Sequence, residues 1–311
     1  MFDFEIRNNL IKATMERLED VLHGKQGVLI RVLVCVFSGG HMLLEDVPGL
    51  GKTTVAVAAA RALGLSFGRV QCTNDLLPTD VTGLNIFKAA RGEFEFHPGP
   101  IFNNILLVDE INRATPKTQS ALLEAMGEEQ ATIDGQTYKL VPPFMVIATQ
   151  NPIEHSGTFP LPESQMDRFM MKASIGYPSL DAEREILRVG SQKVPIENLA
   201  PVLDREQVVD CQNFIDKGVI ASEKILEYIL TIAYATRKRS MIEIGVSTRG
   251  AMVMLKCAKC VAWMRGRDYV VPEDVKIFAR DVLTHRLQPS SGSRSDMRAV
   301  VEAILQEVPA P

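Results

Sequence analysis

The sequence predicts an α/β protein in which a parallel sheet lies between helices, followed by a domain made of helices. In the first half of the chain, short apolar runs with the length of buried strands alternate with helical segments. These runs cover residues 42–45, 68–72, 105–109 and 144–149. From residue 176 the strand-like runs disappear, and helical periodicity continues to about residue 305. The alternation is typical of a parallel sheet covered on both faces, and its loss indicates a second architecture.

A linker near residue 178 predicts the boundary between the two parts. Gly176, Pro178 and Ser179 have linker character, and Ser179 can cap a following helix. We therefore expect a first domain at 1–178 and a helical domain at 179–311.

Two insertions interrupt the alternation, at about 81–100 and 130–141. In the first, Gly92 breaks a short alternating apolar pattern, and in the second Asp134-Gly135 is a strong two-residue turn signal. Both insertions are expected to form hairpins, although loops without a function can have the same pattern.

The segment before residue 42 predicts two helices. The second, at 28–37, is apolar but is interrupted by Arg31, and it is shorter than the roughly 18 residues that a membrane span needs. The opening MFDFEIRNNL carries acids early and lacks the apolar centre of a signal peptide. We expect neither a membrane span nor secretion.

Composition narrows the class of protein. The net charge of −4 argues against a protein dominated by nucleic-acid or anionic-membrane binding. Among five cysteines, Cys257 and Cys260 have C-x-x-C spacing, but neither a second pair nor neighbouring histidines accompany them. We expect these cysteines to pack in the core of a helix pair, and reduced cysteines indicate the cytoplasm.

Residues 46–53, DVPGLGKT, predict a phosphate-binding loop between an apolar run and an alanine-rich helix. Gly49 and Gly51 let backbone N–H groups approach phosphate oxygens, and the helix N-terminus adds partial positive charge. Lys52 can reach the β- and γ-phosphates, and the Thr53 hydroxyl is placed to bind Mg²⁺. Asp46 stands where the strict pattern has Gly, and an ordinary Gly-Pro turn would look similar.

A second motif removes most of that ambiguity. Residues 105–110, ILLVDE, read as a buried parallel strand that ends in two carboxylates. Ligands gather at the carboxyl ends of such strands, so Asp109 and Glu110 should emerge beside the phosphate loop. Asp109 suits the outer shell of Mg²⁺, and Glu110 suits deprotonation of an attacking water. The two motifs together predict binding and hydrolysis of a nucleoside triphosphate.

The chain resembles the MoxR family of AAA+ ATPases over nearly its whole length. The resemblance is carried by LLEDVPGLGKT, GPIFNNILLVDEINRATPKTQSALLEAMGEEQATIDG, VIATQNPIEHSGTFPLPESQMDRF and GVSTRG. It implies an AAA+ core with a C-terminal all-helical lid, and in this family an acid at the position of Asp46 is common. Departures from the family pattern are His155, in place of an amide, and Thr248, in place of proline, which could loosen the turn that presents Arg249.

The resemblance assigns roles to four further residues. Asn151 resembles the polar sensor between the phosphate loop and Glu110. Arg249 resembles the second sensor, which reaches the γ-phosphate of its own subunit from the lid. Arg168 resembles the arginine finger that is presented in trans to a neighbour's nucleotide, and Arg113 is a weaker interface candidate.

Taken together, the expected cofactors are ATP and Mg²⁺. The expected nucleotide-binding residues are Asp46, Val47, Pro48, Gly49, Leu50, Gly51, Lys52, Thr53, Thr54 and Asp109. Thr53 and Asp109 are the expected Mg²⁺ residues, the latter through water.

The family also implies function beyond hydrolysis. Its members form rings, usually hexamers, remodel or mature protein clients, and often act with a von Willebrand factor A domain protein. The two insertions look like the helix-two insert and the pre-sensor hairpin of that clade.

Three alternatives stay open. A magnesium-chelatase-like motor subunit is close in fold, and a scaffold could bind ATP without turnover. A nucleic-acid ring ATPase has only the run Arg237-Lys238-Arg239 in its favour, which a solvated helix face also explains.

Overall fold

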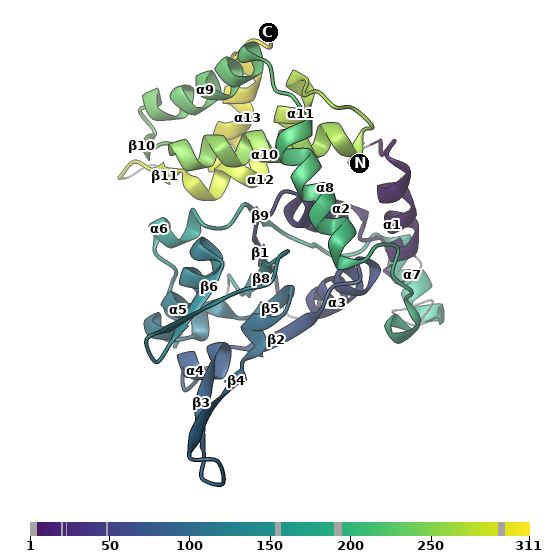
Figure 1. Ribbon diagram of the computed structural model, residues 1–311. Coiled ribbons are helices and arrows are strands. Elements are labelled where there is room, and N and C mark those ends of the chain that lie inside the picture. The colour runs from purple at the N-terminus through teal and green to yellow at the C-terminus, as the bar shows by residue number, and fades with distance from the viewer. Residues whose placement is uncertain are drawn as a thin grey trace.

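The structure is a computed structural model. It describes residues 5–19, 21–22, 24–47, 49–152, 157–189, 195–291 and 296–311. Figure 1 shows a central sheet with helices on both faces and a helical lid stacked beyond α2 (Gln26–Phe37), on the side away from the hairpins.

The central sheet has five parallel strands in the order β2-β5-β8-β1-β9. Their bounds are β1 Met42–Glu45, β2 Phe67–Gln71, β5 Ile105–Asp109, β8 Met145–Gln150 and β9 Met171–Ala173. The four strands expected from sequence are present. The edge strand β9 was not expected, because its three residues are too few to show a period. It pairs with β1 in the register Met42↔Met171.

Alternate side chains of the inner strands enter two different hydrophobic cores. Ile105 and Leu107 of β5 belong to the cluster that includes α2, α3 (Lys52–Ala62) and the lid. Leu106 and Val108 belong to the cluster on the opposite face, with α5 (Pro116–Glu128). A strand buried on both faces reads as a continuous apolar run, which is why ILLV marked it in the sequence.

The helices of the core are α1 Asn9–Glu19, α2, α3, α4 Pro78–Thr82, α5 and α6 Glu163–Met166. Nine of the twelve residues of α2 are buried, so its apolar character reflects a position between the sheet and the lid. Within the described residues, no helix is long and apolar enough to cross a membrane.

Both insertions contain antiparallel hairpins. One is β3 (Gly83–Lys88) with β4 (Glu93–Pro98), and the other is β6 (Gln130–Ile133) with β7 (Gln136–Lys139). Positive φ values of 49° at Asp134 and 81° at Gly135 explain the tight two-residue turn.

The two hairpins touch each other. Phe96 stacks on Tyr138 with ring centroids 4.3 Å apart, and Asn85 donates a hydrogen bond to Asp134 at 2.8 Å. Segments about fifty residues apart therefore form one projection from the core.

The C-terminal region is helical. Its helices are α7 Leu180–Val189, α8 Arg205–Gly218, α9 Glu223–Lys238, α10 Thr248–Met264, α11 Pro272–Ile277, α12 Ala279–Leu283 and α13 Met297–Glu307. The Ser179 hydroxyl accepts a bond from the Ala182 N–H at 3.3 Å, as expected for a helix cap. A short ribbon of β10 (Ile242–Ile244) and β11 (Gln288–Pro289) adds strands that the sequence did not indicate.

The cysteine pair of α10 lies in the hydrophobic core. Cys257 and Cys260 are both buried, and burial raises the pKa of the Cys260 thiol to about 12. The prediction of core packing is confirmed.

Arg286 fastens the lid to the core. Its Nε donates to Asp167 Oδ1 at 2.7 Å, and its Nη atoms donate to backbone carbonyls that include Phe169 at 2.7 Å. The Arg286 side chain is only 2% exposed, so its charge depends on these partners.

His41 is a buried neutral histidine that joins three elements. Its Nε2–H donates to the Met126 carbonyl of α5 at 3.0 Å, and its Nδ1 accepts from the Val146 N–H of β8 at 3.0 Å. Burial lowers the pKa of His41 to about 4, and the bond to Met126 opposes this only partly. Protonation would place a second donor against the Val146 N–H.

We predict that His41 makes the fold acid-sensitive. In the unfolded chain His41 has its usual pKa of about 6.5, whereas in the folded protein its pKa is about 4. Between these two values the unfolded state binds a proton that the folded state does not, so stability falls as the pH drops from about 6.5 to about 4. The free energy of unfolding should fall by roughly 3 kcal/mol from this group over that range. Urea unfolding of wild type and His41→Asn across the range measures it.

The variant is expected to lose part of the pH slope and to be less stable at neutral pH. His285 is also buried with a lowered pKa, so its share of the slope stays in both proteins. Equal slopes in wild type and variant would contradict the assignment to His41.

Candidate nucleotide-binding pocket

The phosphate loop has the backbone conformation that anion binding requires. It connects β1 to α3, and Gly49 and Gly51 have φ values of 87° and 84°, which side-chain-bearing residues rarely adopt. Apart from Gly49 and its chain neighbours, no atom of the described residues lies within 4 Å of a Cβ position at Gly49, so a phosphate has room there. Pro48 lies outside the described residues.

Lys52 folds back onto its own loop. Its Nζ donates to the Asp46 carbonyl oxygen at 2.6 Å. Burial lowers the pKa of Lys52, while the charges of Asp46, Asp109 and Glu110 raise it. The ammonium therefore lies inside a partly dehydrated pocket that holds two carboxylates.

The Asp46 carboxylate accepts three hydrogen bonds from the chain segment that follows β9. It accepts bonds from Ser174 Oγ at 2.5 Å, the Ile175 N–H at 2.5 Å and the Gly176 N–H at 3.3 Å. These donors follow β9 on the way to the lid. The Asp46 side chain therefore supports the segment after β9, and a nucleotide contact of Asp46 stays a prediction.

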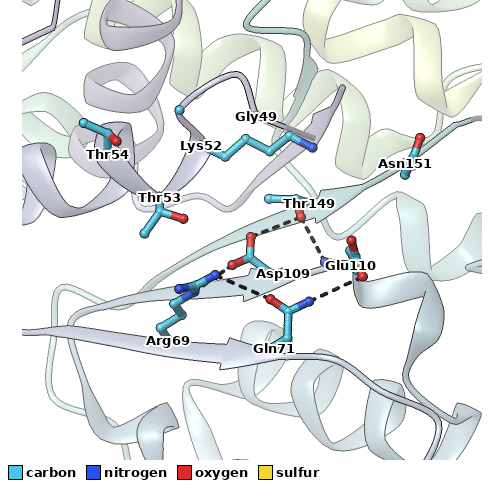
Figure 2. A pocket seen from close by; sticks show the side chains of 11 residues that line it. Gly49, Lys52, Thr53, Thr54, Arg69, Gln71, Asp109, Glu110, Thr149 and Asn151 are labelled. Carbon is cyan, nitrogen blue, oxygen red and sulfur yellow. Dashed lines mark hydrogen bonds and ion pairs between the residues drawn. The ribbon is translucent and has the colours of Figure 1, made fainter. Parts of the chain in front are cut away.

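The pocket wall contains most of the expected residues and several others. It encloses about 390 Å³ and is lined by Gly49, Gly51, Lys52, Thr53, Thr54, Arg69, Gln71, Asp109, Glu110, Thr149 and Asn151. Among the described loop residues, Asp46, Val47 and Leu50 do not form part of this wall. Figure 2 shows the lining side chains coming from the loop and from the carboxyl ends of neighbouring strands.

Asp109 and Glu110 are held by the neighbouring strand β8. The Glu110 N–H donates to Thr149 Oγ at 2.9 Å, and Thr149 Oγ donates to Asp109 Oδ1 at 3.4 Å. Glu110 has φ 56°, an unfavourable value that turns its side chain out of the strand direction. Thr149 is buried, and it holds the Asp109 carboxylate and the Glu110 backbone.

Strand β2 contributes two residues that the sequence analysis missed. Arg69 Nε donates to Asp109 Oδ2 at 2.8 Å, and Gln71 Nε2 donates to Glu110 Oε2 at 3.4 Å (Figure 2). Both residues point to one side of the strand because they are two positions apart. Polar residues at alternate positions of an otherwise apolar strand were the available signal.

Arg113 also contacts Glu110. Its Nη1 lies 3.1 Å from Glu110 Oε2. Arg113 therefore lies beside Glu110 of its own subunit, and its position at an interface stays a prediction.

Arg168 and Arg249 are not part of the wall. Arg168 Nη1 donates to the Leu123 carbonyl of α5. Arg249 is exposed in the first turn of α10, next to Ser247, whose Oγ donates to Asp167 Oδ2 at 3.2 Å. Arg249 thus lies two residues after a contact with Asp167 of its own chain, and its reach to a γ-phosphate stays a prediction.

The residues present fit a magnesium nucleotide. Thr53 and Asp109 supply the oxygen donors that Mg²⁺ prefers, and the open glycine loop with Lys52 fits phosphate groups. Asn151 and Glu110 lie on the same wall, where a reacting water would meet them.

Comparison with known proteins agrees with this geometry. Residues 41–171 match the model of the ATPase family associated with various cellular activities (AAA), and residues 234–308 match the AAA lid domain. Protein YeaC of Bacillus subtilis is 44% identical over 97% of this chain and 95% of its own length. Chaperone MoxR1 of Mycobacterium tuberculosis is 40% identical over 96% of this chain and 82% of its own.

A solved structure supports the same assignment. The crystal structure of a presumed ATPase from Cytophaga hutchinsonii superposes with a TM-score of 0.90 at 39% identity, covering 98% of this chain and 96% of its own. With the phosphate loop, the paired carboxylates and the helical lid in place, the chain belongs to the MoxR family of AAA+ ATPases.

Proposed function

We propose that this chain hydrolyses ATP and uses the energy to remodel or mature a protein client. The observation that carries the proposal is the convergence of Lys52, Asp109, Glu110 and Asn151 on one pocket. The printed name of the relative Chaperone MoxR1 supports work on a protein client. Family resemblance supports a von Willebrand factor A domain partner and maturation of cofactor or metal sites in the client.

Each pocket residue has a task in hydrolysis. Backbone N–H groups of the glycine loop and the Lys52 ammonium would hold the β- and γ-phosphates. Thr53 and Asp109 would hold Mg²⁺, which when bound neutralises charge on the phosphate oxygens. Lys52 must leave the Asp46 carbonyl to reach the phosphates, so ligand binding exchanges one partner of the ammonium for another.

Glu110 would accept the proton of the attacking water. The water oxygen bonds to the γ-phosphorus as the bond to the β–γ bridging oxygen breaks, and ADP and phosphate leave. Asn151 can accept from and donate to that water, which orients it. Gln71 and Arg113 hold the Glu110 carboxylate, so they set where the base points.

We propose that Arg168 and Arg249 both act on the nucleotide of a neighbouring subunit in a ring, with six subunits the expected number. Neither lies on the wall of its own pocket; Arg168 directly follows Asp167, and Ser247, two residues before Arg249, bonds to Asp167. On this view the lid, which we place at 179–311, presents Arg249 outward, and the core at 1–178 presents Arg168.

The basic run that could support a nucleic-acid motor is largely used inside the lid. Arg237 Nε donates to the Val246 carbonyl at 2.8 Å and its guanidinium lies over the Tyr234 ring at 4.8 Å. Arg239 forms an ion pair with Glu307. The run therefore gives the nucleic-acid alternative little support.

Glu110→Gln should bind ATP nearly as well as wild type but turn it over about 100-fold more slowly or worse. The amide keeps the shape and the contact with Arg113 but removes the base, so the loss falls on kcat. Steady-state phosphate release and ATP binding measure the two effects. Glu128→Gln, which removes the same charge from an exposed position on α5, is the control. Turnover within about twofold of wild type would remove Glu110 from this role.

Mixing inactive subunits tests the trans arginines. Lys52→Ala, Arg168→Ala and Arg249→Ala should each have little activity alone, since an arginine finger contributes about 10³-fold or more. Mixing Lys52→Ala with either arginine variant should restore activity at roughly a quarter of the sites, where an intact loop meets an intact arginine. Phosphate release after demonstrated subunit exchange is the measurement.

The two mixtures report separately on the two arginines. If activity recovers in the mixture with Arg168→Ala but not in the mixture with Arg249→Ala, Arg249 acts on the nucleotide of its own subunit. No recovery in either mixture, with folded proteins that exchange, would contradict the trans assignment for both. If the protein stays monomeric with ATP on size-exclusion chromatography, the proposed ring is wrong.

A further inference from the structure

Asp109, which is expected to bind Mg²⁺, forms an ion pair with Arg69. Arg69 Nε lies 2.8 Å from Asp109 Oδ2, and the other oxygen, Oδ1, accepts from Thr149. The Asp109 side chain is 11% exposed, whereas that of Arg69 is 50% exposed. A nearly buried carboxylate is therefore neutralised by a half-exposed guanidinium, whose Nη2 also donates a long hydrogen bond of 3.5 Å to Gln71 Oε1.

Arg69 and Thr53 lie on the same pocket wall as Asp109. In Figure 2 the Arg69 side chain rises from β2 to the Asp109 carboxylate, and Thr53 lies above the same carboxylate on the loop side. Thr53 and Asp109 are the two residues that fit Mg²⁺, and all three side chains line the same pocket. A guanidinium and Mg²⁺ would therefore compete for the Asp109 carboxylate.

We propose that Arg69 is a placeholder for Mg²⁺, which neutralises Asp109 in the nucleotide-free subunit and releases it when the magnesium nucleotide enters. Removing a charge partner from a buried carboxylate is costly, so Asp109 needs such a cation whenever Mg²⁺ is not bound. The released guanidinium stays in the pocket as a second cation beside Lys52 for the phosphates. This inference rests on the proposed ATP site and adds to it a residue that competes with the metal for Asp109.

The opposite role makes the opposite prediction. If Arg69 only holds Asp109 in the orientation that the metal needs, its removal weakens Mg²⁺ binding. If Arg69 competes with the metal, its removal strengthens Mg²⁺ binding, because Asp109 Oδ2 is then free. The sign of the change separates the two roles.

The experiment is a Mg²⁺ titration of the full-length protein with a fluorescent, non-hydrolysable ATP analogue. For Arg69→Gln, the Mg²⁺ concentration at half-saturation should fall about threefold to tenfold, the range expected for loss of a partly exposed ion pair. In EDTA, binding of the analogue should weaken, because one pocket cation is gone. Arg69→Lys, which keeps the charge but not the planar fork, should lie between.

Two controls fix the interpretation. Arg91→Gln removes the same charge from the exposed hairpin and should leave the titration unchanged. In the Asp109→Asn background, Arg69→Gln should no longer improve Mg²⁺ binding, since the contested carboxylate is altered. Circular dichroism establishes whether each variant is folded. If Arg69→Gln does not fold, Arg69→Lys tests the proposal in its place.

Unchanged or weaker Mg²⁺ binding in folded Arg69→Gln, with the analogue still bound, would overturn the placeholder role while leaving the ATP site intact. Absence of analogue binding in wild type would instead overturn the proposed ATP site. The two failures are thus distinguishable.

Discussion

The pocket depends on the parallel pairing of β2, β5, β8 and β1. The registers Gln71↔Asp109 and Leu44↔Thr149 bring four carboxyl ends to one edge of the sheet, although the residues involved span more than one hundred positions. Apolar residues on both faces fix these registers, because a shift by one residue would move each side chain to the opposite core. Hydrophobic packing of the strands therefore determines the positions of the polar side chains at this edge.

Within that frame, the charges of the pocket are satisfied by one another. Lys52 bonds the Asp46 carbonyl, Arg69 pairs with Asp109, and Arg113 and Gln71 hold Glu110. A dehydrated site with two carboxylates would otherwise be costly. A magnesium nucleotide brings its own charges, so its binding must exchange these internal partners for new ones. The Asp46 carboxylate links the same loop to residues 174–176, which lead to the lid. Asp46 therefore contacts both Lys52, through its carbonyl oxygen, and the segment that leads to the lid.

The sequence predicted the parts that depend on local pattern. The continuous run ILLVDE and the glycines of the loop specify a buried strand and an anion cradle almost independently of context, and four of the five sheet strands followed. The strand β9 was missed because three residues carry no period. Arg69, Gln71 and Thr149 were missed because their importance comes from register with β5, which a single strand does not reveal. The position of Arg249 depends on how the lid packs against the core through Arg286, again a long-range property.

The most direct test of the account is equilibrium binding of ATP to the wild-type protein by calorimetry, with and without Mg²⁺. The account predicts saturable binding at about one nucleotide per chain, tighter with Mg²⁺ because Thr53 and Asp109 then share the metal with the phosphates. Binding that does not saturate, or that is indifferent to Mg²⁺, would contradict the assignment of this pocket.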